Sequence, residues 1–464
     1  MRHEARTIVV GGGIAGLGLA HALVQRRGDP ESVVLLEASP RIGGLIQSVA
    51  ANGYRVEWAA NGFIDNAPTT LGLVKELGLE AALEPSSAAA RTRFLYRNGR
   101  LHPLPVSPLA FFKSSILSLP GRLRVGWEPF ARPAPGGDET VHAFAVRRIG
   151  DEAARILVDA MVSGIFAGDS RNLSLESCLP LLKRLETEHG GLLLGMVAKM
   201  RAARGTTGDS GAAAARVDAG PGGNLTSFRE GMESLPRALG QSLRRVETAT
   251  PVVRVAARAG GYRLETFTGE SFESAELVVA APPWSAAEIV RSLDAGLSYE
   301  LATIPAAPIA VVATGFATGE LERPLDGFGF LVPRQQGLRM LGCLWDSSIF
   351  RHRAPEGRVL LRTMVGGAHD PDVVALEPEA ILAIVRAELR QVLGITAVPD
   401  FVRVVRHSHG IPQYVPGHSR RLERIATRLA AHRGLHLAGF GYRGIAVNRV
   451  LEDAAALAER IASR

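Results

Sequence analysis

The chain has 464 residues, of which 46% are hydrophobic and 21% are charged, so it can bury a large core in two or three domains and is not intrinsically disordered. Its formal net charge of +7 permits an anionic partner, but the absence of a basic block with interleaved aromatic residues argues against nucleic acid. The two cysteines, Cys178 and Cys343, lack the spacing of a disulfide framework or a metal site, so no metal ligands are predicted and a reducing compartment is favoured.

A glycine-rich turn lies between the first predicted strand, residues 7–10, and the first predicted helix, residues 17–25. A second apolar run, residues 33–36, ends at Glu37. This order of strand, turn, helix, strand and acid is the one that a dinucleotide site needs. Gly11 to Gly16 would let the backbone approach a pyrophosphate, which the helix N-terminus would bind, and Glu37 would accept hydrogen bonds from ribose hydroxyls.

A second glycine turn follows that acid. Arg41-Ile42-Gly43-Gly44 resembles the extended fingerprint of two-domain flavoproteins of the amine oxidase class, which favours FAD over NAD. The paired glycines allow backbone to lie close to a ligand, and an arginine can contact a phosphate.

The next segments combine strand, helix and hairpin patterns. Residues 54–58 predict a strand, 59–63 a turn and 69–84 an amphipathic helix. Residues 91–105 predict a hairpin around Asn98-Gly99, with arginines along one face.

Residues 106–200 are mostly helical in pattern, and residues 109–119 are strongly apolar. Arg122, Arg124 and Arg132 lie nearby, so this predicted helix either rests at a membrane interface or packs in a core. No run of about 20 apolar residues is uninterrupted, so no membrane-spanning segment is expected.

The second half begins with residues 201–223, whose small, polar and glycine-rich composition predicts a flexible loop. A strand, glycine turn and helix at the C-terminus would return the chain to the nucleotide domain. Strands are predicted at 250–255, 262–267, 277–281, within 308–368, at 401–406 and at 435–439, and helices at about 228–243, at 379–393 and at 449–463.

The chain resembles the FAD-dependent protoporphyrinogen oxidases through nearly its whole length. The GIFAGD, GFGFLVP, GIPQY and GYRGIAVN segments bring it close to the bacterial, oxygen-dependent members. The matching stretches are GGGIAGL at 11–17, EASPRIGGLI at 37–46, RFLY at 93–96, GIFAGDSRNLSLESCLP at 164–180, DGFGFLVP at 326–333, MVGG at 364–367, GIPQY at 410–414 and AGFGYRGIAVN at 438–448.

This resemblance implies an α/β fold with a Rossmann-like FAD-binding domain, a mixed-sheet substrate domain and a helical membrane-docking domain, the amine oxidase-like flavoprotein architecture. The FAD-binding domain would comprise residues 1–85, 224–290 and 430–464, the substrate domain 86–105 and 291–429, and the helical domain 106–200, with the flexible loop at 201–223.

The resemblance also implies which residues bind the ligands. FAD, held without a covalent bond, would contact Gly11, Gly12, Gly13, Ile14, Ala15, Gly16, Glu37, Arg41, Gly43, Gly44, Leu45, Trp58, Ala59, Ala60, Asn61, Val252, Phe440, Ile445, Ala446 and Val447. Arg93 would pair with a substrate propionate, and Gly168, Phe328, Leu331, Trp345 and Met364 would wall the porphyrinogen.

Two positions depart from the family pattern. Many relatives have an arginine where Asn61 stands, and an aspartate where Arg449 stands. No catalytic acid or base is assigned, because His102, His407, His409 and His418 favour structural or surface roles.

The implied function is oxidation of protoporphyrinogen IX to protoporphyrin IX, with three dioxygen molecules reduced to hydrogen peroxide in haem biosynthesis. The alternatives are oxidation of coproporphyrinogen III, an amine oxidase or desaturase, and a non-catalytic porphyrin-binding flavoprotein. The implied location is cytoplasmic, peripherally attached to the inner membrane. A homodimer and docking to the next pathway enzyme are further possible partners, and no nucleic acid is expected.

Overall fold

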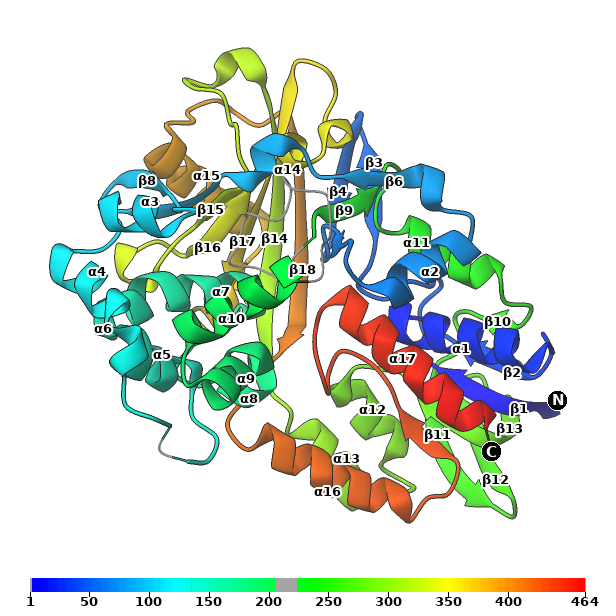
Figure 1. Cartoon of the computed structure of the whole chain (residues 1–464). Coiled ribbons are helices and arrows are strands. Elements are labelled where there is room, and N and C mark those ends of the chain that lie inside the picture. The colour runs from blue at the N-terminus through cyan, green and yellow to red at the C-terminus, as the bar shows by residue number, and fades with distance from the viewer. Residues whose placement is uncertain (1, 135, 206–222, 464) are drawn as a thin grey trace.

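The computed structural model describes residues 2–134, 136–205 and 223–463, which form two sheet-based parts flanked by a group of helices (Figure 1). The mixed α/β architecture predicted from the sequence is confirmed. Within the described residues, no helix combines the length and apolar composition that crossing a bilayer would require.

The first part is built on a sheet with strand order β10-β2-β1-β13-β12-β11, in which β19 also pairs with β13. The strands around β1 are parallel, as the predicted nucleotide fold requires. Its strands are β1 (Arg2–Val10), β2 (Val33–Leu36), β10 (Val246–Glu247), β11 (Val252–Arg258), β12 (Gly261–Thr266), β13 (Ser271–Val279) and β19 (Leu435–Leu437).

Alternate residues of the central strands face opposite layers of helix, because successive strand side chains point to opposite faces of a sheet. Val9 packs with one layer and Ile8 with the other, and both are fully buried. The first layer is α1 (Ile14–Arg27), α11 (Ser234–Gln241) and α17 (Val447–Ala462), and the second is α12 (Pro283–Val290), α13 (Ala295–Ala302) and α16 (His418–Ala430).

The second part is a sheet of strand order β18-β14-β17-β16-β15-β7-β8. One face packs on α15 (Pro378–Leu393) through a core that includes Leu361 and Val385. The strands are β7 (Arg93–Arg97), β8 (Arg100–Pro103), β14 (Ala306–Ala317), β15 (Gly329–Leu331), β16 (Met340–Leu344), β17 (Arg358–Gly366) and β18 (Phe401–Pro412).

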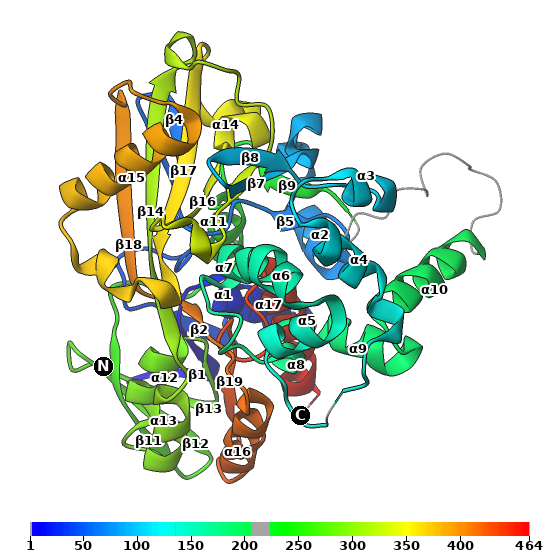
Figure 2. The same ribbon diagram turned by 90° about the vertical axis from the view of Figure 1, so that its left-hand side faces the viewer.

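The opposite face of this sheet is turned toward the helical group, which extends along one side of the molecule (Figure 2). This group comprises α3 (Pro108–Lys113), α4 (Leu119–Gly126), η3 (Glu128–Phe130), α5 (Val141–Ile149), α6 (Asp151–Ala153), the π-helical turn η4 (Ala154–Val158), α7 (Asp159–Phe166), α8 (Leu175–Cys178), α9 (Pro180–His189) and α10 (Leu192–Gly205).

Small elements join these parts. Two short sheets, β3-β4 and β5-β9-β6, lie between the nucleotide sheet and the second sheet. They and the remaining helices are β3 (Ser48–Ala51), β4 (Tyr54–Glu57), β5 (Phe63–Ile64), β6 (Leu83–Pro85), β9 (Leu225–Phe228), α2 (Pro68–Glu76), α14 (Asp346–Ile349), η1 (Glu80–Ala82), η2 (Ala88–Arg91), η5 (Thr318–Glu320), η6 (Arg334–Gln336), η7 (Arg351–Arg353), η8 (Gly367–His369) and η9 (Pro371–Ala375).

The hairpin predicted at 91–105 is confirmed as β7 and β8. Asn98 and Gly99 both have positive φ, at 51° and 77°, as a type I′ turn requires. The helix predicted over 69–84 is wrong beyond Glu76, because Gly78, with φ of 68°, ends the helical path before β6.

The single apolar helix predicted at 109–119 is also wrong. The structure has two helices, α3 and α4, because Ser118 caps a new helix by accepting a hydrogen bond from the Gly121 N–H. Of the loop predicted at 201–223, residues up to Gly205 are helical in α10, and residues 206–222 lie outside the described part of the chain.

The packing also moves two predicted domain limits. Leu297 and Leu301 of α13, together with Ile425 of α16, lie in the core beneath the nucleotide sheet. Both helices were assigned by the sequence to the substrate domain, residues 291–429, but they cover the nucleotide sheet instead.

Candidate functional site

The turn after β1 is shaped by the lack of side chains. Gly11 has φ of 113°, and a Cβ there would lie 2.8 Å from the carbonyl oxygen of Ala280 on the neighbouring strand end. A Cβ on Gly16 would lie 2.0 Å from the Gly11 carbonyl oxygen, so α1 packs against the turn more closely than any side chain allows. Nothing lies within 4 Å of the corresponding position at Gly13, so this point of the turn is open.

The second glycine turn lies directly over the first. The Gly43 N–H donates to the Gly12 carbonyl oxygen at 2.7 Å, and a Cβ on Gly44 would lie 3.1 Å from the Gly13 Cα. Arg41 donates to the Gly44 carbonyl oxygen at 3.0 Å, and its guanidinium lies 5.2 Å from the centroid of the Trp58 ring. The structure therefore brings together two motifs that are 30 residues apart in the chain.

The two glycine turns, residues 11–16 and 41–44, together form a surface that we call the glycine cradle. Glu37 lies at its base. Its side chain is buried, and it accepts hydrogen bonds from the Gly12 N–H at 2.6 Å and the Ser39 N–H at 2.8 Å. Helix α1 has no side-chain cap and no acidic residue in its first turn, so its N-terminal N–H groups can bind a phosphate. These features fit a dinucleotide cofactor. Val252, at the start of β11, follows Thr250, whose N–H donates to the Glu37 carbonyl oxygen.

The segment from Trp58 to Asn61 lies between this cradle and the second sheet. Arg362 of β17 donates to the carbonyl oxygens of Glu57 and Ala59, at 3.3 and 2.9 Å, and pairs with buried Asp346 at 2.9 Å. Asn61 donates to the same Asp346 at 3.3 Å. A buried ion pair therefore fixes the position of Ala59, Ala60 and Asn61, and Asn61 is engaged with the protein rather than free to bind a carboxylate.

The C-terminal loop, residues 439–446, approaches the same region from the other side. Tyr414 is 1% exposed, and its hydroxyl donates to the Phe440 carbonyl oxygen and accepts from the Gly444 N–H at 3.0 Å. Ala446 is exposed and Ile445 is half-buried, whereas the Val447 side chain packs in the core with α1. Only the backbone of Val447, at the uncapped start of α17, is available to a ligand.

The residue before Tyr414 holds a different loop. Gln413 Nε2 donates to the Phe166 carbonyl oxygen at 2.8 Å, and a Cβ on Gly168 would lie 2.5 Å from Gln413 Oε1. Adjacent side chains at the end of β18 therefore hold two loops, residues 166–168 and 440–444. The sequence interpretation noted the GIPQY motif but gave these two side chains no role.

One edge of the second sheet carries the predicted propionate partner. Arg93 begins β7 beside Gly329 of β15, and its guanidinium lies 5.1 Å from the centroid of the Phe328 ring. Leu95, two residues along β7 and on the same face, packs in a cluster with Leu331. Arg93, Phe328 and Leu331 are thus brought together, and the Arg93 side chain is exposed.

Met364 and Gly168 lie further along this face. Met364 packs against Ala167, which adopts a left-handed backbone with φ of 47° at the end of α7. The prediction that Trp345 walls the porphyrinogen site is wrong. Trp345 is 3% exposed, and its ring packs in the core between the sheet and α15, with its centroid 5.3 Å from that of the Phe94 ring. Trp345 therefore lies on the far face and does not wall the site.

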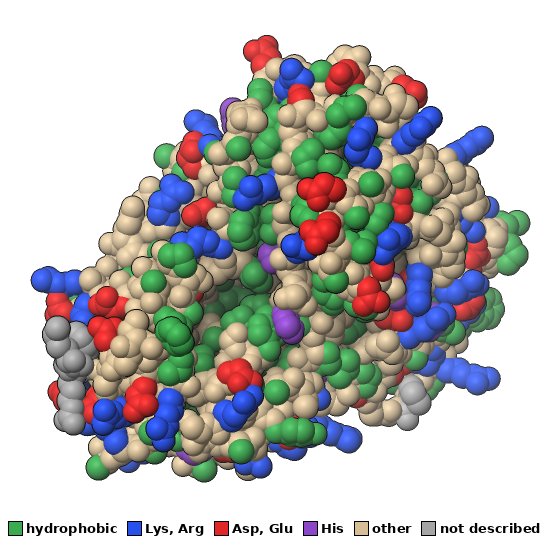
Figure 3. Space-filling view, turned by 180° about the vertical axis from the view of Figure 1, so that it is seen from behind, with side chains coloured by type: hydrophobic (Ala, Val, Ile, Leu, Met, Phe, Trp, Pro, Cys, Tyr) green, Lys and Arg blue, Asp and Glu red, His purple; other side chains and the backbone are tan. Residues whose placement is uncertain are grey.

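The surface between the parts is hollowed. Figure 3 shows this hollow lined largely by hydrophobic side chains, with histidine side chains beside it. An apolar hollow with a few polar groups is the usual form of a site for a large organic ligand.

Three histidines of this region are engaged in structure. His407 donates to the Trp58 carbonyl oxygen at 3.2 Å, His418 donates to the Tyr442 carbonyl oxygen at 2.8 Å, and His409 stacks on Trp284 with ring centroids 5.0 Å apart. Burial lowers the pKa of His407 and of His418 below the ordinary value. These contacts support structural roles and identify no catalytic base.

Comparison with known proteins places this geometry in a family. The model of the flavin containing amine oxidoreductases matches residues 14–462. The chain is 34% identical over 468 residues to the protoporphyrinogen oxidase of Homo sapiens, covering 97% of this chain and 96% of that one. It is 30% identical over 460 residues to the coproporphyrinogen III oxidase of Bacillus subtilis, covering 96% and 95% of the two chains.

A solved structure agrees with this placement. The structure is similar to that of an Exiguobacterium protein provisionally named as a protoporphyrinogen oxidase, with a TM-score of 0.84, 25% identity and coverage of 99% of both chains. The full-length match covers both the glycine cradle and the second sheet. The chain is therefore an FAD-dependent oxidoreductase and belongs to the flavin containing amine oxidoreductase family.

Proposed function

We propose that this protein oxidises protoporphyrinogen IX to protoporphyrin IX, with three dioxygen molecules reduced to three molecules of hydrogen peroxide. The observation that carries the proposal is the face of the second sheet, where the exposed Arg93 stands beside the apolar side chains of Phe328 and Leu331. A porphyrinogen has this combination of an apolar ring and carboxylate arms. The relatives named for porphyrinogen oxidation support the same substrate class.

The reaction removes six electrons and six protons from the porphyrinogen, in three equal steps, and each dioxygen accepts two of each. FAD, when bound in the glycine cradle, supplies the two-electron acceptor and passes the electrons to dioxygen. The protein binds and orients the substrate and excludes water from the hollow.

Each residue of the face has a separate task in this proposal. Arg93 forms a bidentate ion pair with one propionate and so fixes the rotation of the ring. Leu331 and Met364 contact the ring body, where burial of apolar surface contributes roughly 25 cal/mol per Å². Gly168 lets this loop pack closely, because a Cβ there would lie 2.5 Å from Gln413 Oε1 and 2.7 Å from Leu173 Cδ1.

Coproporphyrinogen III is a second candidate substrate, which the likeness to the Bacillus subtilis coproporphyrinogen III oxidase favours. It carries more carboxylates than protoporphyrinogen IX, so its binding should depend more strongly on arginine and on salt. Purified holoenzyme is assayed with each porphyrinogen in air, and porphyrin fluorescence is followed. A higher kcat/KM for protoporphyrinogen IX supports the proposal. The proposal is contradicted if the enzyme oxidises neither porphyrinogen.

We also propose that the helical group attaches the protein peripherally to an anionic membrane surface. Exposed apolar side chains crowd onto α3, α4 and η3, and Lys113 and Arg132 are exposed beside them. The apolar residues with the highest exposed fractions in this group and just before it are Val106, Leu109, Leu119, Leu123, Trp127 and Phe130, each more than 60% exposed. A patch of this kind on a folded protein marks an interaction surface.

Vesicle sedimentation tests this surface. The Trp127→Asp, Phe130→Asp double variant should no longer sediment with phosphatidylserine-containing vesicles. Phe267→Asp is the matched control, because Phe267 is 79% exposed on a turn of the nucleotide sheet, outside the helical group. Equal sedimentation of the double variant and the control variant contradicts the proposed attachment.

A further inference from the structure

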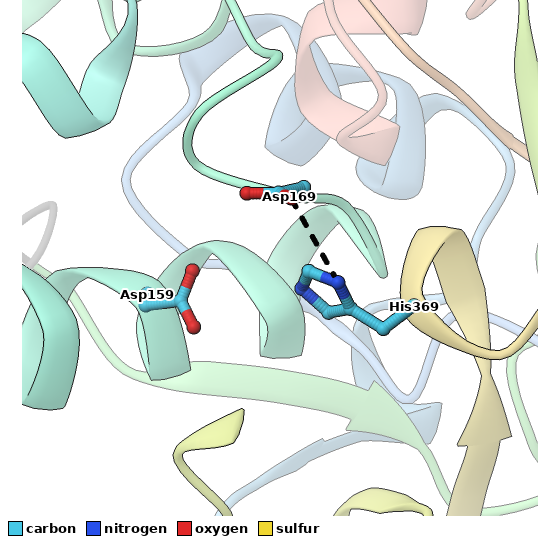
Figure 4. A group of neighbouring side chains, drawn as sticks. All are labelled: Asp159, Asp169 and His369. Carbon is cyan, nitrogen blue, oxygen red and sulfur yellow. Dashed lines mark ion pairs between the residues drawn. The ribbon is translucent and has the colours of Figure 1, made fainter. Parts of the chain in front are cut away.

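Three side chains with metal-binding atoms meet behind the loop that carries Gly168. Asp159 begins α7, Asp169 follows that helix, and His369 ends η8 after β17. One ligand atom from each lies within 4.8 Å of the others (Figure 4). His369 Nδ1 lies 3.9 Å from Asp169 Oδ2.

Two of these groups have bonding capacity that the described protein does not use. Asp159 is 7% exposed, accepts one hydrogen bond from the Ser170 hydroxyl at 2.8 Å, and has no ion pair among the described residues. His369 Nε2 is buried and has no hydrogen-bond partner in the described part of the chain. Figure 4 shows that nitrogen turned toward Asp159. Buried charges are normally paired or bound to a metal, because a bare one is costly.

We propose that Asp159, Asp169 and His369 bind one divalent first-row transition-metal cation, each through a single oxygen or nitrogen atom. Carboxylate and imidazole ligands suit Mn²⁺ and Zn²⁺. Metal–ligand distances of about 2.0–2.2 Å place ligand atoms no more than roughly 4 Å apart, so the three side chains must draw in slightly. Water would complete the coordination.

Bound there, the cation would connect α7, the loop after it and the turn after β17. The end of α7 and the turn after β17 are already joined by a hydrogen bond from the Ala368 N–H to the Ala167 carbonyl oxygen at 2.7 Å. None of the three ligands is itself a proposed flavin or porphyrinogen contact, and Asp169 directly follows Gly168 in the chain. Its effect would be to stabilise the loop that walls the hollow.

One cation of the protein competes for the same position. Arg334 Nη1 lies 3.4 Å from Asp169 Oδ2, and the Arg334 side chain is 49% exposed. An exposed arginine can move into solvent when a metal binds, because an exposed pair is weak. Removing this charge should therefore leave metal binding intact or strengthen it.

The test is metal content and affinity of the flavin-loaded holoprotein. The protein is treated with EDTA, desalted and titrated with Mn²⁺ and with Zn²⁺, and bound metal is measured by mass spectrometry and calorimetry. We expect one equivalent per chain of at least one of these metals. Asp159→Asn and His369→Gln should weaken that binding at least tenfold, and Arg334→Gln should not weaken it.

Controls separate loss of metal from loss of fold. Asp169→Asn keeps the side-chain oxygen that accepts from the Arg171 N–H at 2.9 Å, so its turn should survive while metal affinity falls. His352→Gln, at an exposed histidine outside the cluster, should bind metal like the unchanged protein. All variants should keep the flavin spectrum. Absence of stoichiometric binding, or binding that persists in both Asp159→Asn and His369→Gln, overturns the proposal without bearing on the flavin reaction.

Discussion

Tyr414→Phe tests whether the end of β18 holds the C-terminal loop against FAD. The substitution removes only the hydroxyl, which donates to the Phe440 carbonyl oxygen and accepts from the Gly444 N–H. A buried polar group that loses its partner costs about 1–3 kcal/mol. For two groups in one loop we take about 2–3 kcal/mol. Each 1.4 kcal/mol is tenfold in affinity, so the Kd for FAD should rise, with roughly 30- to 150-fold as the upper limit that is reached when these hydrogen bonds form only in the FAD complex.

The assay is fluorescence titration of the apoprotein with FAD. Tyr262→Phe is the matched control, because Tyr262 is also buried and its hydroxyl donates to a backbone carbonyl, that of Arg433, at 2.9 Å. Tyr262 lies in the antiparallel strand β12 of the nucleotide sheet, so this variant should lose stability but keep its Kd. The reasoning is refuted if Tyr414→Phe loses stability to the same extent and still binds FAD with unchanged Kd.

Three further predictions follow from the same geometry. Arg93→Ala should raise the KM for the porphyrinogen with FAD still bound, and an unchanged KM in steady-state assays would remove the propionate assignment. Gly13→Val should fold but purify without yellow colour, because the space at this Cβ position is open in the protein, whereas Gly16→Val should yield little folded protein by circular dichroism. His418→Gln should flatten the fall in Tm between pH 7 and pH 5, because burial lowers the folded pKa of His418, so the unfolded chain binds the extra proton as the pH drops below about 6.5. An equally steep fall in the variant would show that His418 does not carry this dependence.

The glycine cradle could be predicted because the backbone contacts that require glycine there lie within short segments of the chain. The turn between β1 and α1 needs glycine at positions fixed by close backbone contacts, and these leave a direct trace in the sequence. The Asn98-Gly99 hairpin was predictable for the same reason, since its turn type selects those residues.

The rest depends on contacts between distant segments. Gln413 holds residue 166 and Tyr414 holds residue 440, but nothing in the local sequence indicates which loops lie beside β18. The proposed metal ligands could not be grouped from the sequence, because His369 is 200 residues from Asp169. Trp345 was misplaced because an aromatic residue fits either face of a sheet, and packing against Phe94 put it on the face covered by α15.

The charged residues that hold the segment before Asn61 in place could not be predicted from the sequence either. Arg362 could have been a surface arginine, yet it is 2% exposed and spans from Asp346 to the segment before Asn61. Buried ion pairs carry no sequence signature, because the same residue types occur mostly at the surface.

The most direct test of the central claim is anaerobic mixing of the yellow holoenzyme with protoporphyrinogen IX. The account predicts that the visible flavin absorption bleaches, then recovers with porphyrin fluorescence when air is admitted. A flavin band that stays unbleached in the presence of protoporphyrinogen IX and of coproporphyrinogen III would contradict it.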